Sequence, residues 1–407
     1  MLERLYVDNY RCMVNFECRF GSKQLILGPN GGGKTTLFNV LGTIRDFCTN
    51  GVPAENLFLG FSQTRWQNIP EQTFEMDVSG NGGLYTFRLV VGYSGQPTAR
   101  PRVLMEQVFF EGKPIYRFLR GEVQLFNDNH EEKEKYPFDW SRSAIATIPE
   151  RADNKKLSWF KRWLGALLLI SPDPHRMFQL APMEAPVPDV FLSNFAGWYR
   201  HLRQESDDYK LREDLREVIP GFQSMDLKDA GMGNRLLVLT FSVNGQQGRV
   251  MSSLNVPTTT SPAPTSINVP TTASQGSTTS TQPPQTSSLY SFSELSDGQR
   301  VLIGLYTVLH FALRSGATVC FDEPDNFIAL KEIQPWLDKV LERVDEEADT
   351  QVLFASHHPE LLNRLALTGG LVLDRPEGRH TRVQPFSDPA QTGLSPAELV
   401  SRGWENE

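Results

Sequence analysis

Four short segments, far apart in the chain, carry residue types that bind and hydrolyse phosphoanhydrides. Glycines in the first segment let several backbone N–H groups turn toward one anion, and its lysine adds a positive charge for the β- and γ-phosphates. A threonine hydroxyl after that lysine is a ligand type that Mg²⁺ accepts. This loop therefore predicts a Mg²⁺-ATP site, with Thr35 as a metal ligand and Lys34 as a catalytic cation. Its residues are Gly28, Pro29, Asn30, Gly31, Gly32, Gly33, Lys34, Thr35 and Thr36.

Two adjacent carboxylates, Asp322 and Glu323, end the apolar run that begins at Thr318. We expect Asp322 to hold Mg²⁺, directly or through water, and Glu323 to orient and deprotonate the attacking water. A solvated strand end would explain this pair if it stood alone. The phosphate loop in the same chain favours the catalytic interpretation.

A histidine follows the next apolar run, Val352 to Ala355. An imidazole N–H at a strand end next to the phosphate loop can donate to the γ-phosphate and fix the water. His358 competes for this role because the two histidines are adjacent. The register of the motif favours His357, and we expect His358 only to flank the turn that follows.

The fourth segment, Leu295-Ser296-Asp297-Gly298-Gln299, is close to an LSGGQ signature. The Ser296 hydroxyl, the Gly298 N–H and Gln299 stand at the start of a predicted helix, which makes a second anion site. Capping of that helix would explain Ser296 by itself. With the other three segments in order, we favour the phosphate-binding interpretation.

The spacing of apolar residues predicts an α/β fold around a parallel sheet covered on both faces. Residues 2–28 read as three strands, and the third runs into the phosphate loop and a helix from Thr35 to about Phe47. After the signature, helices alternate with short buried strands. We therefore assign residues 1–60 and 290–385 to the two lobes of one nucleotide-binding head.

The middle of the chain has a different pattern. Alternating residues and a Gly80–Gly83 turn predict an antiparallel β subdomain over 70–127. Residues 150–245 predict a helical insertion with a returning strand, and the clearest helix runs from Tyr199 to Val218. Residues 251–290 are rich in Ser, Thr and Pro and contain no charged residue, so we expect them to be disordered. Residues 386–407 are assigned to a C-terminal tail.

Together the four segments resemble the soluble ABC-type ATPases of the RecF/SMC/OLD-like group, the AAA family "predicted ATPases" of bacteria. The first strand, Leu5 to Arg11, is also similar to that group. The resemblance implies a P-loop NTPase with an ABC-type head, and a homodimer in which Ser296 of one copy seals the ATP held by Lys34 of the other. Larger oligomers stay open. Asp297 departs from the usual glycine. Gln63 and Gln67 are candidates for the expected glutamine loop, and an exposed polar residue explains each of them at least as well.

The resemblance favours an ATPase that dimerises head-to-tail on ATP and drives or gates a DNA-repair or phage-defence complex. The alternative is a low-turnover ATP-binding scaffold that holds a nuclease or toxin partner inactive. We expect a nuclease or toxin to be a separate chain, because few residues follow the last predicted strand. The nucleotide-binding subunit of a membrane transporter is a weaker third interpretation, because the stretch between the glycine loop and the signature is unusually long.

Composition places limits on partners and compartment. No apolar run reaches the ~18 residues of a membrane span, and the N-terminus has no secretory pattern, so we expect a cytoplasmic protein with four buried, reduced cysteines. A net charge of −8 gives no general attraction to nucleic acid, and DNA stays open as a ligand only through a local basic patch. The basic and aromatic residues of 151–163 are a candidate, although we favour an amphipathic helix with a solvated face.

Overall fold

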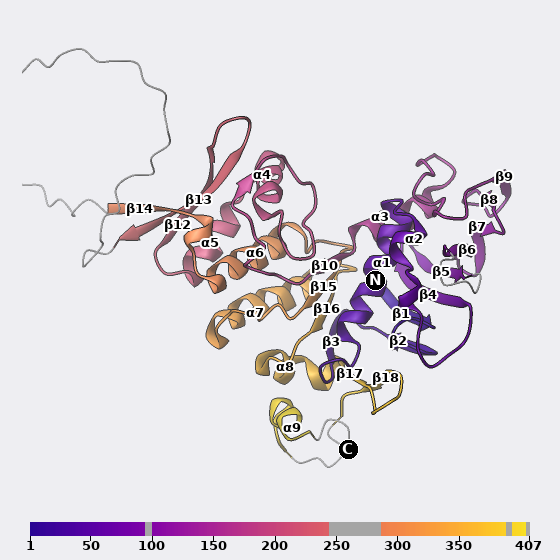
Figure 1. Ribbon diagram of the computed structural model, residues 1–407. Coiled ribbons are helices and arrows are strands. Elements are labelled where there is room, and N and C mark those ends of the chain that lie inside the picture. The colour runs from indigo at the N-terminus through magenta and orange to yellow at the C-terminus, as the bar shows by residue number, and fades with distance from the viewer. Residues whose placement is uncertain (94–99, 244–285, 388–392, 404–407) are drawn as a thin grey trace, which may run out of the picture.

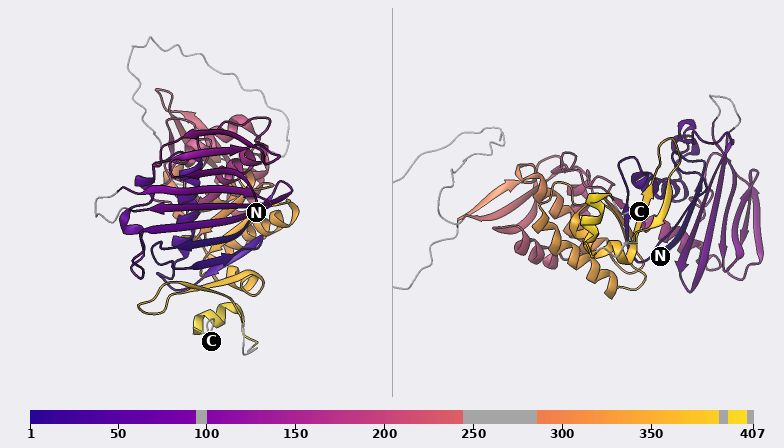
Figure 2. Two further views of the ribbon diagram at one scale, coloured as in Figure 1. Left: turned by 90° about the vertical axis from the view of Figure 1, so that its right-hand side faces the viewer. Right: turned by 90° about the horizontal axis from the view of Figure 1, so that it is seen from below.

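The computed structural model describes residues 1–93, 100–243, 286–387 and 393–403. Figure 1 shows a central sheet between helices, with a large antiparallel sheet at one end and a smaller sheet, built on β12 and β13, at the other. Figure 2 shows the large sheet face-on in its left view and as a separate layer in its right view. Across the described ranges, no helix combines the length and apolar character that crossing a membrane requires.

The central sheet carries the phosphate loop. Its order is β10-β15-β16-β3-β17-β18, and the first five strands are parallel while β18 runs antiparallel to β17. Because parallel strands end at one edge, the segments that follow β3, β15, β16 and β17 come together there. The strands are β3 (Lys23–Leu27), β10 (Leu168–Ile170), β15 (Thr318–Asp322), β16 (Gln351–Ala355), β17 (Gly370–Asp374) and β18 (Arg382–Pro385).

Alternate side chains of the central sheet enter two different hydrophobic cores. In β3, Ile26 belongs to the core shared with α1 and the antiparallel sheet, whereas Leu25 and Leu27 belong to the core shared with α6, α7 and α8. In β15, Cys320 and Phe321 divide in the same way. The sheet is therefore buried on both faces, which confirms the α/β fold expected from the sequence.

Nine α-helices lie in the described part of the chain. Of those that cover the central sheet, α1 packs on one face and α6, α7 and α8 on the other. They are α1 (Lys34–Thr49), α2 (Ala54–Leu57), α3 (Lys155–Ala166), α4 (Phe195–Glu205), α5 (Tyr209–Val218), α6 (Asp297–Phe311), α7 (Leu330–Glu346), α8 (Pro359–Gly369) and α9 (Pro396–Arg402). The residues of α9 fall in the expected tail, 386–407, and α9 packs on α8 through the buried Leu399.

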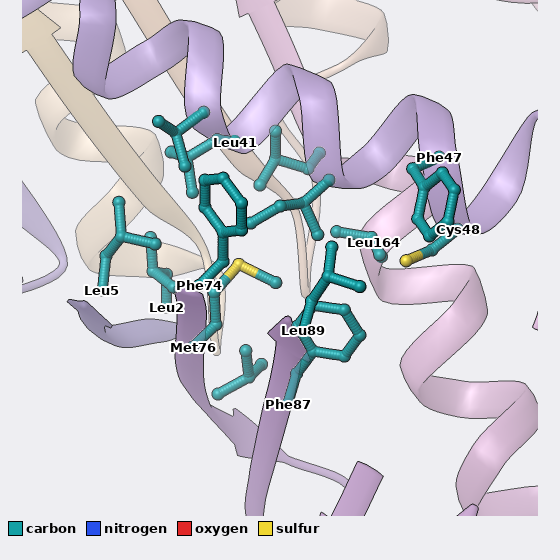
Figure 3. Close-up of a cluster of buried hydrophobic side chains, with 14 of the residues drawn as sticks. Leu2, Leu5, Leu41, Phe47, Cys48, Phe74, Met76, Phe87, Leu89 and Leu164 are labelled. Atoms are coloured by element: carbon teal, nitrogen blue, oxygen red, sulfur yellow. The ribbon is translucent and has the colours of Figure 1, made fainter. Parts of the chain in front are cut away.

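The antiparallel sheet has eight strands in the order β2-β1-β4-β5-β6-β7-β8-β9. Its Asn81-Gly82 turn has positive φ at both residues, which suits the two-residue hairpin predicted there. Figure 3 shows Phe74 and Phe87 of this sheet in one cluster with Leu41 and Phe47 of α1. The strands are β1 (Leu2–Asp8), β2 (Phe16–Arg19), β4 (Glu71–Gly80), β5 (Gly83–Gly92), β6 (Arg102–Phe110), β7 (Lys113–Leu119), β8 (Glu122–Phe126) and β9 (Glu132–Pro137).

The antiparallel sheet is larger than the predicted subdomain of residues 70–127. The N-terminal strands β1 and β2, which we placed in the head lobe of residues 1–60, pair with β4 in this sheet, and β9 extends it to Pro137. Buried and exposed positions alternate in β1, as is typical of an antiparallel strand with one solvated face. A strand of a two-sided parallel sheet is more uniformly apolar, as β16 is.

The segment 150–245 is less helical than expected. The strand β10 follows α3 and joins the central sheet, and β11 (Leu180–Ala181) and β12 (Phe222–Asp229) join the expected returning strand β13 (Arg235–Val243). Short apolar runs such as 167–170 fit a helix or a strand equally well, and pairing with β15 decides the outcome. The helix predicted from Tyr199 to Val218 is broken before Asp208, whose carboxylate accepts hydrogen bonds from Arg203 and Arg212.

The prediction of disorder over 251–290 is wrong for its last five residues. Residues 251–285 lie outside the described residues. Residues 286–290 belong to β14 (Thr286–Ser291), which pairs with β13 from Thr286 to Ser291. This antiparallel ladder gives the backbone of residues 286–290 partners that the sequence composition does not reveal.

The basic and aromatic stretch at 151–163 packs as an amphipathic helix. Trp159 stacks on Tyr85 with ring centroids 4.8 Å apart, and Phe160 is fully buried. The Nζ atoms of Lys156 and Lys161 donate to backbone carbonyls at 2.7 Å. The aromatic side chains of α3 are therefore core residues, as we favoured from the sequence.

Phe87 tests how much stability the core between α1 and the antiparallel sheet supplies. Phe87→Ala should lower the free energy of unfolding by about 3–5 kcal/mol, because it leaves a cavity in a fully buried cluster. Leu84→Ala in the same strand removes a side chain that is 38% exposed and should cost about 1 kcal/mol or less. Urea unfolding followed by circular dichroism measures both. Equal losses would contradict this placement of the core.

Candidate functional site

The phosphate loop follows β3 and opens α1, which is the strand–loop–helix context that its sequence requires. Gly28, Gly31 and Gly33 have φ values of +135°, +80° and +115°. A Cβ atom at Gly28 would lie 2.1 Å from the backbone oxygen of Leu373 in β17. Only glycine fits here, because the loop passes directly against the end of the neighbouring strand.

Lys34 lies between the loop and the end of β16. Its Nζ donates to the Gly28 carbonyl at 2.6 Å and is 2.7 Å from His357 Nε2. Burial and the nearby Lys34 ammonium lower the pKa of His357, so the imidazole is neutral at pH 7 and Nε2 accepts from the lysine. His358 instead caps α8, because its Nδ1 accepts from the Glu360 N–H. The structure thus places His357, the histidine favoured from the sequence, beside Lys34, while His358 caps a helix.

Asp322 stands at the end of β15, facing the loop. Its Oδ1 is buried and has no hydrogen-bond partner among the described residues. Burial raises the pKa of Asp322, while a hydrogen bond from Thr35 and the charge of Lys34 oppose the rise. An orphaned carboxylate oxygen next to a threonine hydroxyl is the donor set that fits Mg²⁺, which also keeps waters and phosphate oxygens as ligands.

Glu323 directly follows Asp322 and has a strained backbone conformation. Its φ is +49°, and its N–H donates to the Ala355 carbonyl at 2.8 Å. Burial and the charges of Asp325 and Asp322 raise the pKa of Glu323 to about 7, and Lys34 offsets part of the rise. Asp325 is fixed near this group because its Oδ1 accepts from Ser356 Oγ at 2.6 Å. A carboxylate with a pKa near neutrality is suited to general base catalysis.

Lys34, Thr35 and Glu323 line a pocket of about 650 Å³, whereas Asp322 and His357 are not among its lining residues. Seven of its lining residues were not among the catalytic and binding residues predicted from the sequence, although one of them, Gln63, was a candidate for the glutamine loop. The sequence contains hints for two of them. Trp66 follows the basic residue Arg65, and Arg375 follows the strand β17, which lies beside β3, the strand that leads into the phosphate loop. The lining comprises Arg11, Cys12, Pro29, Asn30, Gly31, Gly33, Lys34, Thr35, Thr36, Phe61, Gln63, Arg65, Trp66, Glu323 and Arg375.

The two glutamine candidates differ in position. Gln63 lines the pocket, and its Nε2 donates to the Ile69 carbonyl at 3.3 Å. Gln67 donates to Asp8 Oδ1 at 3.2 Å, and its own Oε1 is buried without a partner in the described part of the chain. The geometry therefore favours Gln63 as the residue that can reach a bound nucleotide.

The signature segment lies away from this pocket. The helix that it opens, α6, covers the face of the central sheet opposite to α1 (Figure 1). Among the described residues that line the pocket, none comes from 295–299. The exposed Ser296 and the partly buried Gln299 form a reciprocal capping box. Gly298 packs so closely that a Cβ atom would lie 2.7 Å from the Phe327 carbonyl oxygen.

Asp297, the departure from the usual signature, is paired within its own helix. Arg300 Nη2 is 2.5 Å from Asp297 Oδ1, and His175 Nε2 is 3.9 Å from the other oxygen. Arg300 also donates to the Pro174 carbonyl at 2.6 Å, which holds its guanidinium in place. The ion pair offsets the negative charge that Asp297 adds at the start of α6.

Comparison with known proteins gives matches at three levels. Residues 25–363 match the family described as "AAA domain, putative AbiEii toxin, Type IV TA system". A 97-residue stretch is 34% identical to an OLD nuclease of Thermus scotoductus, covering 22% of this chain and 17% of that protein. The chain thus spans about a sixth of the length of this curated relative.

Solved structures with a similar fold are heads of SMC proteins. The SMC head bound to the C-winged helix domain of ScpA is 12% identical, with a TM-score of 0.52 over 94% of this chain and 97% of that one. The SMC head domain of Thermotoga maritima is 11% identical, with a TM-score of 0.42 over 95% and 99%. At this identity the first match shows the fold alone.

The raised pKa of Glu323 predicts that replacing it with a neutral residue stabilises the fold by an amount that depends on pH. Because the folded-state pKa is about 7 and the ordinary value 4.5, protonation stabilises the fold at low pH, and this contribution is lost as pH rises through 7. Glu323→Gln should therefore raise the unfolding temperature at about pH 8 and much less at about pH 5. Glu342→Gln, at an exposed position of α7, is the matched control. A Glu323→Gln shift of the same size at both pH values would contradict the assignment.

Proposed function

The chain belongs to this AAA domain family and has the fold of the ABC-type ATPases of the RecF/SMC/OLD group, and from this premise we propose that it hydrolyses Mg²⁺-ATP at a site shared by two copies. One observation carries the proposal. The pocket of a single chain contains Lys34 and Glu323, while Ser296 lies outside it on an exposed helix start. A head-to-tail pair of copies would bring the two parts together twice, by symmetry.

Triphosphate binding follows from the loop and from α1. The backbone N–H groups of residues 29–35 and the positive end of the α1 dipole favour an anion at the helix start. Lys34 is already held at this end by Gly28 and His357, so its charge needs little rearrangement to reach a phosphate. We assign the β- and γ-phosphates to Lys34.

Magnesium ligation is assigned to Thr35 and Asp322. The orphaned Oδ1 of Asp322 offers the carboxylate oxygen, and the Thr35 hydroxyl offers the second protein ligand. When bound, Mg²⁺ would neutralise charge on the phosphates. It would also lower the pKa of Asp322, which burial raises.

Water activation is assigned to Glu323, and a contact with the γ-phosphate to His357. Glu323 accepts a proton most readily above about pH 7, where it is ionised. The imidazole of His357 is neutral, and in the tautomer that carries its proton on Nδ1 the Nε2 atom accepts from Lys34. A reorientation of the ring would let its N–H donate to the γ-phosphate. The strained φ of Glu323 is held by its hydrogen bond to Ala355 and fits a residue positioned for function.

The signature of the second copy would complete the site. Ser296 offers a hydroxyl and the N-terminus of α6 a positive dipole end, and both are exposed to a partner. The pairing of Asp297 with Arg300 lets this helix start approach a triphosphate without an unpaired negative charge. Concentration-dependent hydrolysis is the expected consequence, because each site needs residues from two copies.

We assign the wider role to a DNA-repair or phage-defence complex with a nuclease or toxin partner in trans. The support is the stretch of similarity to an OLD nuclease and the toxin system named in the family description. A low-turnover scaffold is the alternative, since that description also fits a chain that restrains a toxin. Steady-state turnover separates them: dimer-dependent hydrolysis supports the ATPase, and near-zero turnover with tight ATP retention supports the scaffold.

Glu323→Gln should trap the ATP-bound dimer. The amide keeps the size of the side chain but cannot take a proton from water, so ATP binds and hydrolysis slows by about a hundredfold or more. Light scattering with size-exclusion chromatography and saturating Mg²⁺-ATP should show the variant as a dimer, and as a monomer without nucleotide. A variant that stays monomeric while its ATP site is filled would overturn the shared-site proposal.

A further inference from the structure

The pocket extends beyond the phosphate loop to a second group of residues from three segments. Arg11 follows β1, Phe61 and Trp66 lie between α2 and β4, and Arg375 follows β17. The proposed catalytic steps use none of them. An indole, a phenyl ring and guanidinium groups are the side chains that stack on nucleobases.

Trp66 and Arg375 contact each other in a cation–π interaction. The Arg375 guanidinium lies over the Trp66 ring, 5.0 Å from its centroid. Trp66 Nε1 donates to the Gly378 carbonyl at 2.7 Å, which ties the ring to the segment that also carries Arg375. Arg375 itself reaches the phosphate loop, with Nη1 at 3.5 Å from the Gly31 carbonyl oxygen.

The Trp66 ring is held in place before any ligand arrives. It is partly buried and packs against the core beneath the antiparallel sheet. The backbone at the base of this side chain is also fixed: the Trp66 backbone N–H donates to Thr64 Oγ1 at 3.5 Å, and the Thr64 backbone N–H donates to Oδ1 of the buried Asn9 at 3.1 Å. A platform ordered in advance loses little side-chain entropy when a base stacks on it.

We propose that Trp66, with Arg375, is the platform on which the nucleobase of the bound triphosphate stacks. The inference rests on the proposed function, because it takes the triphosphate to lie on the phosphate loop. The Nε1–H of Trp66, its one polar hydrogen on the ring, already donates to the Gly378 carbonyl, so Trp66 offers a base only its ring. Stacking therefore supplies the affinity for the base, and Trp66 acts on the nucleoside and not on the phosphates.

Trp66→Ala tests the platform by comparing Mg²⁺-ATP with inorganic tripolyphosphate. Isothermal titration calorimetry should show about a tenfold or greater loss of ATP affinity, with tripolyphosphate affinity unchanged. Trp66→Phe keeps an aromatic ring and should restore most of the ATP affinity. Trp140→Ala is the matched control, because Trp140 also carries a stacked guanidinium, that of Arg102 at 4.0 Å, but does not line the pocket.

The outcomes separate the two proposals. Lys34→Ala should weaken both ligands, because Lys34 is assigned to the phosphates. Suppose that wild-type protein binds ATP and that Trp66→Ala changes the affinity for ATP no more than Trp140→Ala does. The stacking role of Trp66 is then refuted, while the ATP site stands. Equal losses of ATP and tripolyphosphate affinity in Trp66→Ala would also refute it, since they would place Trp66 at the phosphates. A wild-type protein that binds neither ligand would refute the proposed function.

Discussion

The parallel order of the central sheet is the constraint on which the site depends. It brings the ends of β3, β15, β16 and β17 to one edge, and with them the phosphate loop, the two carboxylates, His357 and Arg375. The same sheet separates these groups from the signature, because α1 and α6 cover opposite faces. A chain built in this way places Lys34, Thr35 and Glu323 around one pocket and leaves Ser296 exposed outside it.

Electrostatic coupling links the groups at that edge into one unit. Lys34 lowers the pKa of His357 and opposes the burial that raises the pKa values of Asp322 and Glu323. Anion binding at the loop would redistribute this charge, so the protonation of Glu323 and the position of Lys34 respond together. The close-packed cores on both faces of the sheet hold the strand ends in place, so a change in charge shifts the pKa values of these groups and not the positions of the strands.

The sequence was sufficient for the parts of the site where residue type dictates geometry. Glycines with positive φ, a lysine at a helix start and carboxylates at a strand end have few other arrangements, and the structure places Gly28, Lys34 and Asp322 accordingly. It was insufficient where pairing is decided over long distances. The membership of β1 in the antiparallel sheet, the strand β10 and the closeness of Trp66 to Arg375 depend on segments that are far apart in the chain, and local periodicity does not encode such pairings.

The central claim, that two copies share each site, is tested most directly by mixing two inactive variants. Lys34→Ala removes one half of the site and Ser296→Arg blocks the other, so neither should hydrolyse ATP alone. In an equimolar mixture half of the dimers are mixed, and each mixed dimer has one of its two sites intact, which gives about a quarter of wild-type turnover. A mixture as inactive as its components, or full activity of Ser296→Arg alone, would contradict the shared site.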